Sequence, residues 1–307
     1  MLRFLISRVL QGIVVIFAVL CITFLLLRMA PGGPFDRDKE VPEHVKASLE
    51  RQYGLDQPWY VQLYRHLKSY ATLDLPDSYR FKGMGVGEII AQGFPISAKV
   101  GLAALGIALL IGVPAGSLAA LRVNTFEDRA TMLLSSLGLC LPSLVLGPVM
   151  ATLFGVKLRW FNAGGWYDAD DWVLPSLTLG IIYSAYIARL MRTGLRETLS
   201  QDYIRTARAK GVSEGVIVVR HAAKLAVIPL INFLGPAAAG LLSGSFVTET
   251  VFQLPGLGQH FVAAAVNKDY TLAMATAAFY ALWIVIFNLL VDVLQAMLNP
   301  RITLGHA

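Results

Sequence analysis

The most distinctive chemistry in this 307-residue chain lies in residues 189–224, a basic segment between two long apolar runs. Three cations, Arg205, Arg208 and Lys210, stand directly before Gly211. The pattern predicts two helices separated at this glycine, which ends the first helix in the left-handed conformation. Such a stiff basic tip suits either the cytoplasmic face of a membrane or docking of a protein with acidic groups.

The second helix of this segment is expected to begin just after Ser213. Ser213 can cap its first turn, and Val216, Val219 and Ala223 recur at helical spacing beyond it. A helix pair broken by one glycine transmits force better than a long flexible linker.

The remaining residues that could carry chemistry are scattered. The five histidines show no His-Glu-x-x-His or clustered ligand spacing, and Cys21 and Cys140 lie inside apolar runs. The chain has no Gly-x-x-x-x-Gly-Lys-Ser/Thr sequence for cradling nucleotide phosphates and no Gly-x-Ser-x-Gly nucleophile motif. We therefore expect no catalytic residue, no metal site and no bound cofactor.

The composition indicates a membrane protein. Hydrophobic residues make up 56% of the chain and charged residues 15%, against roughly 25% charged in soluble domains. About 20 apolar residues cross a bilayer as a helix, so six uncharged runs predict six spans and exclude an outer-membrane barrel. The runs are 9–27, 100–121, 130–156, 172–188, 225–248 and 270–291.

One further uncharged run, 251–267, is interrupted by Pro255, Gly256 and Gly258. We interpret it as a bent loop with a short interfacial helix, and a seventh span is the alternative.

The distribution of Lys and Arg predicts the orientation. These residues concentrate in the termini and in 122–129 and 189–224, whereas 157–171 and 249–269 carry few. We expect the basic pieces, including both termini, to be cytoplasmic. A cleaved signal peptide is the alternative for the first run, but Arg28 follows it and no small-residue cleavage pattern is evident. The net charge of +6 then reflects topology, and no nucleic-acid partner is expected.

Residues 28–99 form the one long polar stretch on the outer side. A helix is predicted from Pro42, in its first turn, to Tyr53, with Gly54 ending it. A second helix is predicted to start near 56–58, and its apolar stripe is Tyr60, Leu63, Leu67 and Tyr70. The pair is expected to pack on the outer mouth of the membrane domain or, alternatively, to lie on the membrane surface.

The predicted spans carry features of a packed bundle. Two Gly-x-x-x-Gly spacings, 112–116 and 240–244, allow close approach of another helix. Prolines that remove a backbone donor inside or beside the spans are tolerated where protein or water satisfies the freed carbonyl. They are Pro114, Pro142, Pro148, Pro229 and Pro236.

Residues 203–211, followed by 220–222 and by Ile228-Pro229, resemble the cytoplasmic "EAA" loop of ABC-importer permeases. Arg205 stands at the family's Glu position and Thr206 at its first Ala, and these departures agree with the peptide branch. Further segments resemble that branch and its B-type membrane subunits. They are 27–35, 95–101, 244–250, 254–259, 267–270 and 288–292.

The resemblance implies an all-α polytopic membrane protein with six transmembrane helices in the type I ABC-importer permease fold, in the bacterial inner (cytoplasmic) membrane. It implies an N-terminal transmembrane helix at 1–29 and a periplasmic helical segment at 30–93. The permease core would occupy 94–293, with the coupling loop at 189–224, and a cytoplasmic tail would occupy 294–307.

The resemblance also implies the partners and a mechanism of alternating access. We expect a C-type permease subunit as heterodimer partner, two ATPase subunits that hold ATP and Mg, a periplasmic peptide-binding protein, and the lipid bilayer. The chain itself would not be an enzyme. The residues expected to couple to an ATPase subunit are Arg205, Ala207, Arg208, Ala209, Lys210, Gly211, Val212 and Ser213.

A substrate pathway would be lined by polar side chains on apolar helices. The candidates are Asn232, Ser243, Ser245, Thr248, Ser135, Ser136 and Ser143. Alternatively, the hydroxyls bond to their own helix and the amide joins two helices. Glu249, at the outer end of the fifth span, is expected either to meet a peptide's amino terminus or to be an exposed interfacial anchor.

Other functions stay open at this point. Permeases of the same branch also carry dipeptides, glutathione or nickel chelates. More distant alternatives are an ATPase-independent channel or carrier and an intramembrane enzyme. All six runs lack Asp, Glu, Lys and Arg, which disfavours a proton-coupled carrier and an aspartyl intramembrane enzyme.

Overall fold

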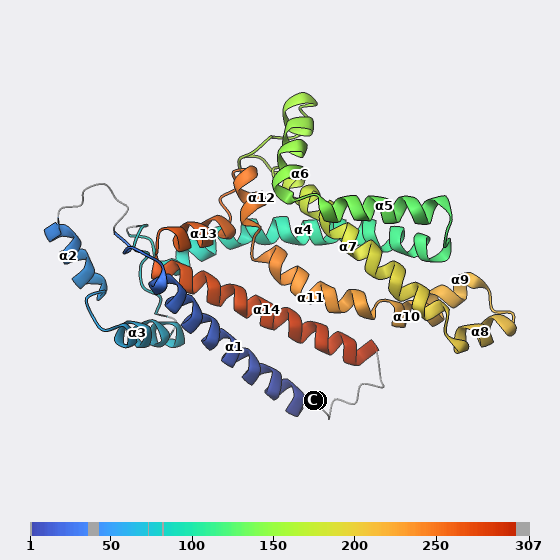
Figure 1. Cartoon of the computed structure of the whole chain (residues 1–307), viewed down its shortest axis with the longest axis horizontal. Helices are drawn as coiled ribbons and strands as arrows, with labels where there is room; N and C mark the ends of the chain where they lie inside the picture. The colour runs from blue at the N-terminus through green and yellow to red at the C-terminus, as the bar shows by residue number, and fades with distance from the viewer. Residues whose placement is uncertain (1, 36–42, 73, 82, 299–307) are drawn as a thin grey trace.

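The computed structural model describes residues 2–35, 43–72, 74–81 and 83–298, and helices dominate these residues (Figure 1). In chain order the elements are α1 (Leu2–Met29), α2 (Glu43–Tyr53), α3 (Trp59–Thr72), α4 (Val86–Leu121), α5 (Phe126–Cys140), α6 (Ser143–Met150), the π-helix η1 (Ala151–Lys157), α7 (Val173–Leu199), α8 (Asp202–Ala209), α9 (Glu214–Val216), the π-helix η2 (Ile217–Ala222), α10 (Ala223–Ala226), α11 (Ile228–Leu242), α12 (Phe246–Val251), α13 (Leu257–Val266) and α14 (Tyr270–Leu298).

Five of the predicted spans are present as segments long and apolar enough to cross a membrane. They are Ile6–Met29, Val86–Leu121, Val173–Leu199, Ile228–Val251 and Tyr270–Met297. The fourth of these contains a turn at Gly244, whose φ of 92° separates α11 from α12.

The third predicted run is not a straight span. Its residues form two helical segments, Phe126–Cys140 and Ser143–Lys157, which meet at an angle of 101°. The cause is Pro142, which has no N–H to continue the helix and forces Leu141 into an extended conformation with ψ 112°. The third run is therefore either a broken span or a re-entrant segment, and the structure has five or six spans in the residues that it describes.

The uncharged run 251–267 contains only one short apolar helix, α13 (Leu257–Val266). Ten residues of α-helix are about 15 Å long, half of the hydrocarbon thickness. A seventh span is therefore ruled out, and the bent loop with a short helix is confirmed.

The course of the long helices fixes which loops share a side. The first part of α1 and the last part of α14 lie at the same end (Figure 1), where Arg8 Nε is 2.9 Å from Asp292 Oδ2. The turn between α4 and α5 and the α8–α10 region lie toward that end, whereas α2, α3 and α13 lie at the other. We call these the inner and outer ends, and the assignment of the inner end to the cytoplasm stays a prediction from charge.

The closest helix packing joins α4 and α7 along glycines. A Cβ atom at Gly116 would lie 2.3 Å from the carbonyl oxygen of Ala188, and one at Gly112 would lie 2.7 Å from that of Ser184. The first Gly-x-x-x-Gly spacing thus serves close approach, as predicted. In the second spacing Gly240 has no neighbour within the described part of this chain, whereas Gly244 forms a turn that Glu249 and Gly258 approach closely.

At the outer end, α2 and α3 pack around the outer ends of α1 and α14. Gly54 ends α2 with a φ of +68°, as expected, while Pro42 lies outside the described residues. The predicted stripe of α3 was wrong at Tyr60, whose side chain is 60% exposed. The face of α3 that packs on the rest of the chain instead carries Gln62 and His66, which are both buried. Gln62 donates hydrogen bonds to two backbone carbonyls in the turn before α3.

Candidate functional site

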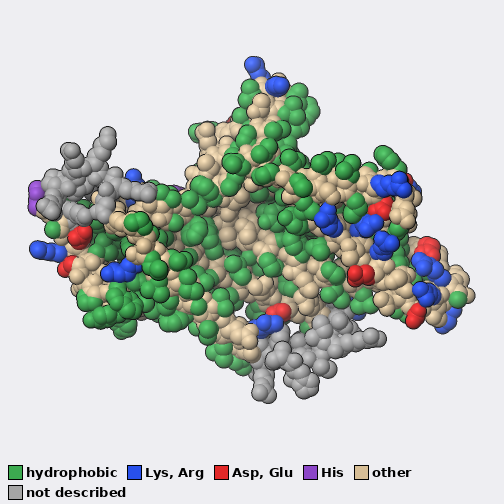
Figure 2. Space-filling view, in the orientation of Figure 1, with side chains coloured by type: hydrophobic (Ala, Val, Ile, Leu, Met, Phe, Trp, Pro, Cys, Tyr) green, Lys and Arg blue, Asp and Glu red, His purple; other side chains and the backbone are tan. Residues whose placement is uncertain are grey.

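The strongest candidate site is the inner tip built by α8, the Gly211 turn and α9. The tip is directly connected to a membrane span, because α7 runs without interruption from Val173 to Leu199 and α8 begins three residues later. Figure 1 shows α8 and α9 at the extreme inner end, and Figure 2 shows Lys, Arg, Asp and Glu gathered there.

The α8 helix is fixed to the rest of the chain by its apolar face. Ile204 is fully buried and Ala207 is buried, and both pack in one cluster with Leu195 of α7 and Ile217 of η2. The expectation that Ala207 offers a docking surface is therefore wrong, because its methyl group holds α8 against this chain. Ala209, in contrast, is exposed.

Gly211 has the conformation that the sequence predicts. Its φ is +77°, its N–H donates to the carbonyl of Arg208 at 2.9 Å, and the N–H of Val212 donates to that of Ala207 at 3.2 Å. These two bonds define a Schellman ending, in which the partly buried Val212 packs against the same apolar cluster. Ser213 occupies the cap position of α9, but its side chain makes no capping hydrogen bond, which corrects that part of the prediction.

The charged residues of the tip divide into two groups. Arg208 donates from Nε and Nη2 to the two carboxylate oxygens of Glu214, at 2.6 and 3.2 Å, and this lowers the pKa of Glu214. Arg208 therefore clamps the turn rather than offering its charge outward. Arg205, 3.5 Å from the exposed Asp202, and Lys210 are on the surface.

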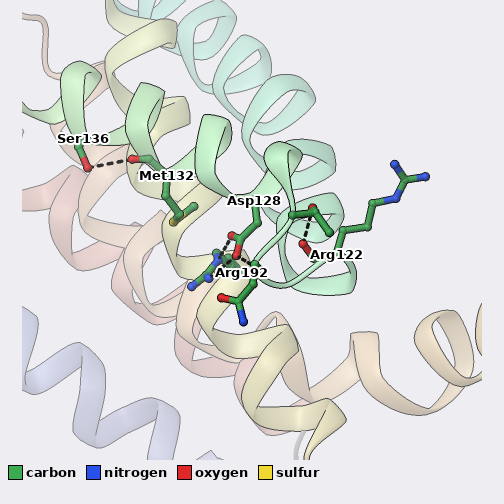
Figure 3. A network of polar contacts seen from close by, with 7 residues as sticks. Arg122, Asp128, Met132, Ser136 and Arg192 are labelled. Atoms are coloured by element: carbon green, nitrogen blue, oxygen red, sulfur yellow. Dashed lines mark hydrogen bonds and ion pairs between the residues drawn. The ribbon is translucent and has the colours of Figure 1, made fainter.

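A buried ion pair behind the tip escaped the sequence analysis. Arg192 of α7 donates to both carboxylate oxygens of Asp128 in α5, at 2.5 and 2.8 Å (Figure 3). The backbone N–H of Asn124 donates to the same carboxylate at 3.0 Å. The side chains are only 19% and 4% exposed, so this pair joins the inner ends of α5 and α7.

Several of the predicted pathway residues make hydrogen bonds within this chain. The hydroxyls of Ser136 and Ser243 donate to carbonyls of their own helices, at 2.8 and 2.7 Å, as the alternative interpretation expects. Asn232 accepts a hydrogen bond from Gln295 and so joins α11 to α14. Ser245 caps α12 by accepting from the N–H of Thr248. Of the others, Ser135 and Thr248 are buried and Ser143 is half-buried.

Glu249 is neither an exposed anchor nor open to a ligand in this conformation. Its side chain is 2% exposed and accepts hydrogen bonds from Ser97 Oγ at 2.7 Å and from the N–H of Gln259 at 3.0 Å. Ser97 Oγ also accepts from the N–H of Leu257 at 2.9 Å. Gly256 lies so close that a Cβ there would clash with the carboxylate. The group thus holds the start of α13 against α4.

At the same outer end, Lys268 closes the end of α1. Its ammonium donates to the carbonyls of Ala30, at 2.7 Å, and of Pro31 and Gly32. These carbonyls belong to the turn that directly follows α1, so Lys268 fixes this turn and adds a cation near the C-terminus of the helix. For metals, no cluster of three or more His, Cys, Asp or Glu side chains suited to an ion occurs in the described part of the chain.

Comparison with known proteins decides the family. A family model for the inner membrane component of binding-protein-dependent transport systems matches residues 112–304, and a model for the N-terminal part of such components matches residues 1–75. The chain belongs to this family of inner membrane transport components. The broader match contains α8, the Gly211 turn and the buried pair of α5 and α7.

Individual members of this transport family match the chain along nearly its whole length. The oligopeptide transport system permease protein OppB of Haemophilus influenzae is 40% identical, with 98% of this chain and 99% of that protein covered. OppB of Escherichia coli K12 is 39% identical, with the same coverage. The dipeptide transport system permease protein DppB of Bacillus subtilis is 39% identical, with 99% of each covered.

A solved structure supports the fold of this transport component. A crystal structure of an amino acid ABC transporter with histidines superposes with a TM-score of 0.52 at 18% identity. The superposition covers 68% of this chain and 94% of the other. Together with the helical architecture and the family match, this confirms the all-α permease fold and the inner-membrane location predicted from the sequence.

Proposed function

We propose that this permease is the B-type membrane subunit of an ATP-driven, binding-protein-dependent importer of oligopeptides. The observation that carries the proposal is the near-full-length similarity to proteins named oligopeptide permeases. In this proposal a C-type permease subunit completes the translocation pathway. Two ATPase subunits bind ATP and Mg, and a periplasmic peptide-binding protein delivers the substrate. The chain itself binds no cofactor.

The tip at the inner end would couple ATP hydrolysis to transport. An ATPase subunit would contact the solvent-exposed side of α8 and the Gly211 turn, through Arg205, Ala209 and Lys210. Because Ile204 and Ala207 fix α8 against α7, a displacement of the tip is passed into a membrane span rather than absorbed locally. The spans then alternate between outward-open and inward-open arrangements.

The coupling proposal is tested by charge reversal at the exposed cations. We expect Arg205→Glu combined with Lys210→Glu to weaken copurification of ATPase subunits, because neither side chain is buried in this chain. Lys157→Glu, an exposed change in η1 outside the tip, is the matched control. Unchanged ATPase copurification and unchanged substrate-stimulated ATP hydrolysis in the double variant would contradict the role of the tip.

The substrate is tested separately, in vesicles that contain the complete transporter and its binding protein. We expect ATP-dependent uptake of labelled peptides of three or more residues. Competition by dipeptides, glutathione or a nickel chelate that exceeds competition by longer peptides would move the assignment to another member of the branch. Uptake by this chain without ATPase subunits would favour a channel or carrier instead.

A further inference from the structure

The α3 helix has two faces with different surroundings, and only one of them is covered by this chain. On the covered face His66 packs 6.0 Å from the ring of Phe24 in α1, and the hydroxyl of Tyr70 donates to the carbonyl of Thr271 in α14 at 2.9 Å. Leu63 and Leu67 pack against the same cluster. The helix is therefore held firmly against the outer ends of two membrane-spanning helices.

Beside this covered face, and at the start of the helix, α3 exposes three large aromatic side chains. Trp59, Tyr60 and Tyr64 are 47%, 60% and 67% exposed, and the rings of the first two lie edge to face 6.0 Å apart. Tyr60 and Tyr64 are one helical turn apart and so share a face. An exposed cluster of this kind in one short helix marks a contact surface rather than ordinary solvated protein.

This aromatic surface lies next to the exposed apolar side of α1. The outer half of α1, a membrane span, exposes apolar side chains up to its last residue, Met29. They include Ile22, Leu25 and Leu26. Figure 2 shows hydrophobic side chains covering this edge of the molecule, along α1 and over the region of α3. The aromatic surface thus lies where the apolar belt of a span gives way to the outer polar segment.

The residue types match the boundary between lipid and water. Trp and Tyr combine an apolar ring with a polar atom and are enriched at the headgroup level of membrane proteins. The exposed Lys68 follows one turn after Tyr64, the exposed Arg65 is adjacent, and α3 contains no acidic residue. Cations beside these aromatic rings can pair with the phosphate groups of lipids. The neighbouring helix α2 suits this contact less well, because it carries the partly exposed Glu50.

We propose that Trp59, Tyr60 and Tyr64 of α3 lie among the lipid headgroups of the outer leaflet and anchor the outer segment to the bilayer. The α3 helix then packs on α1 and α14 through its buried side chains and on lipid through these exposed aromatic side chains. The segment that carries α2 and α3 is thereby held at a fixed height above the membrane. The proposal concerns the bilayer and does not depend on which substrate is transported.

The test measures the depth of spin labels on the complete transporter in phosphatidylethanolamine–phosphatidylglycerol vesicles. Cys21 and Cys140 are first replaced by Ala, and Tyr64→Cys is compared with Gln52→Cys, an exposed control on α2. We expect collisions with oxygen, relative to collisions with a water-soluble nickel complex, to be several-fold more frequent at position 64 than at 52. Equal ratios at the two positions would overturn the proposal.

A second measurement uses a conservative substitution, Trp59→Phe, so that the proposal can still be tested if a cysteine variant fails to fold. Lipids brominated near the headgroup should quench the tryptophan fluorescence of the wild type more than that of Trp59→Phe, because Trp59 is the contacted ring. Equal quenching in both would refute the lipid contact. Immobilisation of the label at 64 only after addition of the binding protein would assign this surface to a protein partner and would also overturn the proposal.

Discussion

The buried ion pair between Asp128 and Arg192 allows a quantitative test of how the inner ends of α5 and α7 are held together. Asp128→Ala removes two charged hydrogen bonds, at 2.5 and 2.8 Å, and leaves the N–H of Asn124 without this acceptor. It also strands a guanidinium that is only 19% exposed. Removing one partner of a buried pair costs about 3–5 kcal/mol, and the remaining exposure of Arg192 favours the lower end.

The expected consequence is a large fall in thermal stability. In a chain of 307 residues a loss of about 3 kcal/mol lowers the Tm by about 5 °C. The measurement is the unfolding temperature of the detergent-purified transporter, followed by intrinsic fluorescence. Glu127→Ala is the matched control in the same helix, because its ion pair with Arg122 is exposed and surface pairs contribute little.

A double-mutant cycle separates the pair from other effects of the substitutions. Asp128→Leu combined with Arg192→Met replaces both charges by apolar groups, so no buried charge is stranded. We expect the double variant to be more stable than Asp128→Leu or Arg192→Met alone. Losses that simply add, or single variants within 2 °C of wild type, would refute the view that this pair joins the two helices.

Three further predictions concern the packing and the outer end. Gly116→Val should disrupt assembly of the transporter, measured by size-exclusion chromatography, because even a Cβ would lie 2.3 Å from the carbonyl of Ala188. His66 should make stability depend on pH, because burial lowers its pKa to about 4. The charge of Arg65 lowers this pKa further, and the charge of Asp269 opposes the shift. The unfolded chain binds the proton first, so stability should fall as pH drops from 6.5 toward 4, by about 3 kcal/mol, and His66→Phe should flatten this thermal-unfolding profile. Lys268→Met should leave the carbonyls of Ala30, Pro31 and Gly32, in the turn after α1, without this donor and make the region exchange amide hydrogens faster, whereas unchanged exchange would contradict that role.

The sequence predicted the elements that depend on local pattern. Apolar runs without charge located the spans, and the left-handed Gly211 followed from helical spacing that ends at a glycine. The break in the third run at Pro142 does not follow from the sequence pattern. A proline inside a membrane run permits either a mild kink or a full break, and only the packing around it decides.

The side-chain partners could not be predicted in the same way. Asp128 stands between Glu127 and Arg129 and looks like an ordinary loop charge, and its partner lies 64 positions away in Arg192. Likewise, the burial of Glu249 depends on Ser97, 152 positions earlier in the chain. Such contacts arise from how the helices come together, and no local periodicity carries that information. The role of Ala207 was misjudged for the same reason, since helical spacing gives a face but not what covers it.

The glycine contacts between α4 and α7 have a consequence for the transport cycle. With Gly112 and Gly116 seated against the backbone of α7, the two helices can neither slide nor separate without opening a void or creating a clash. They therefore form one strut, with α8 at its inner end and, through Ser97, the start of α13 at its outer end. The transport pathway must therefore open and close where other helices meet the α4–α7 pair. A displacement of α8 at the inner end then tilts the whole pair and moves the start of α13 at the outer end.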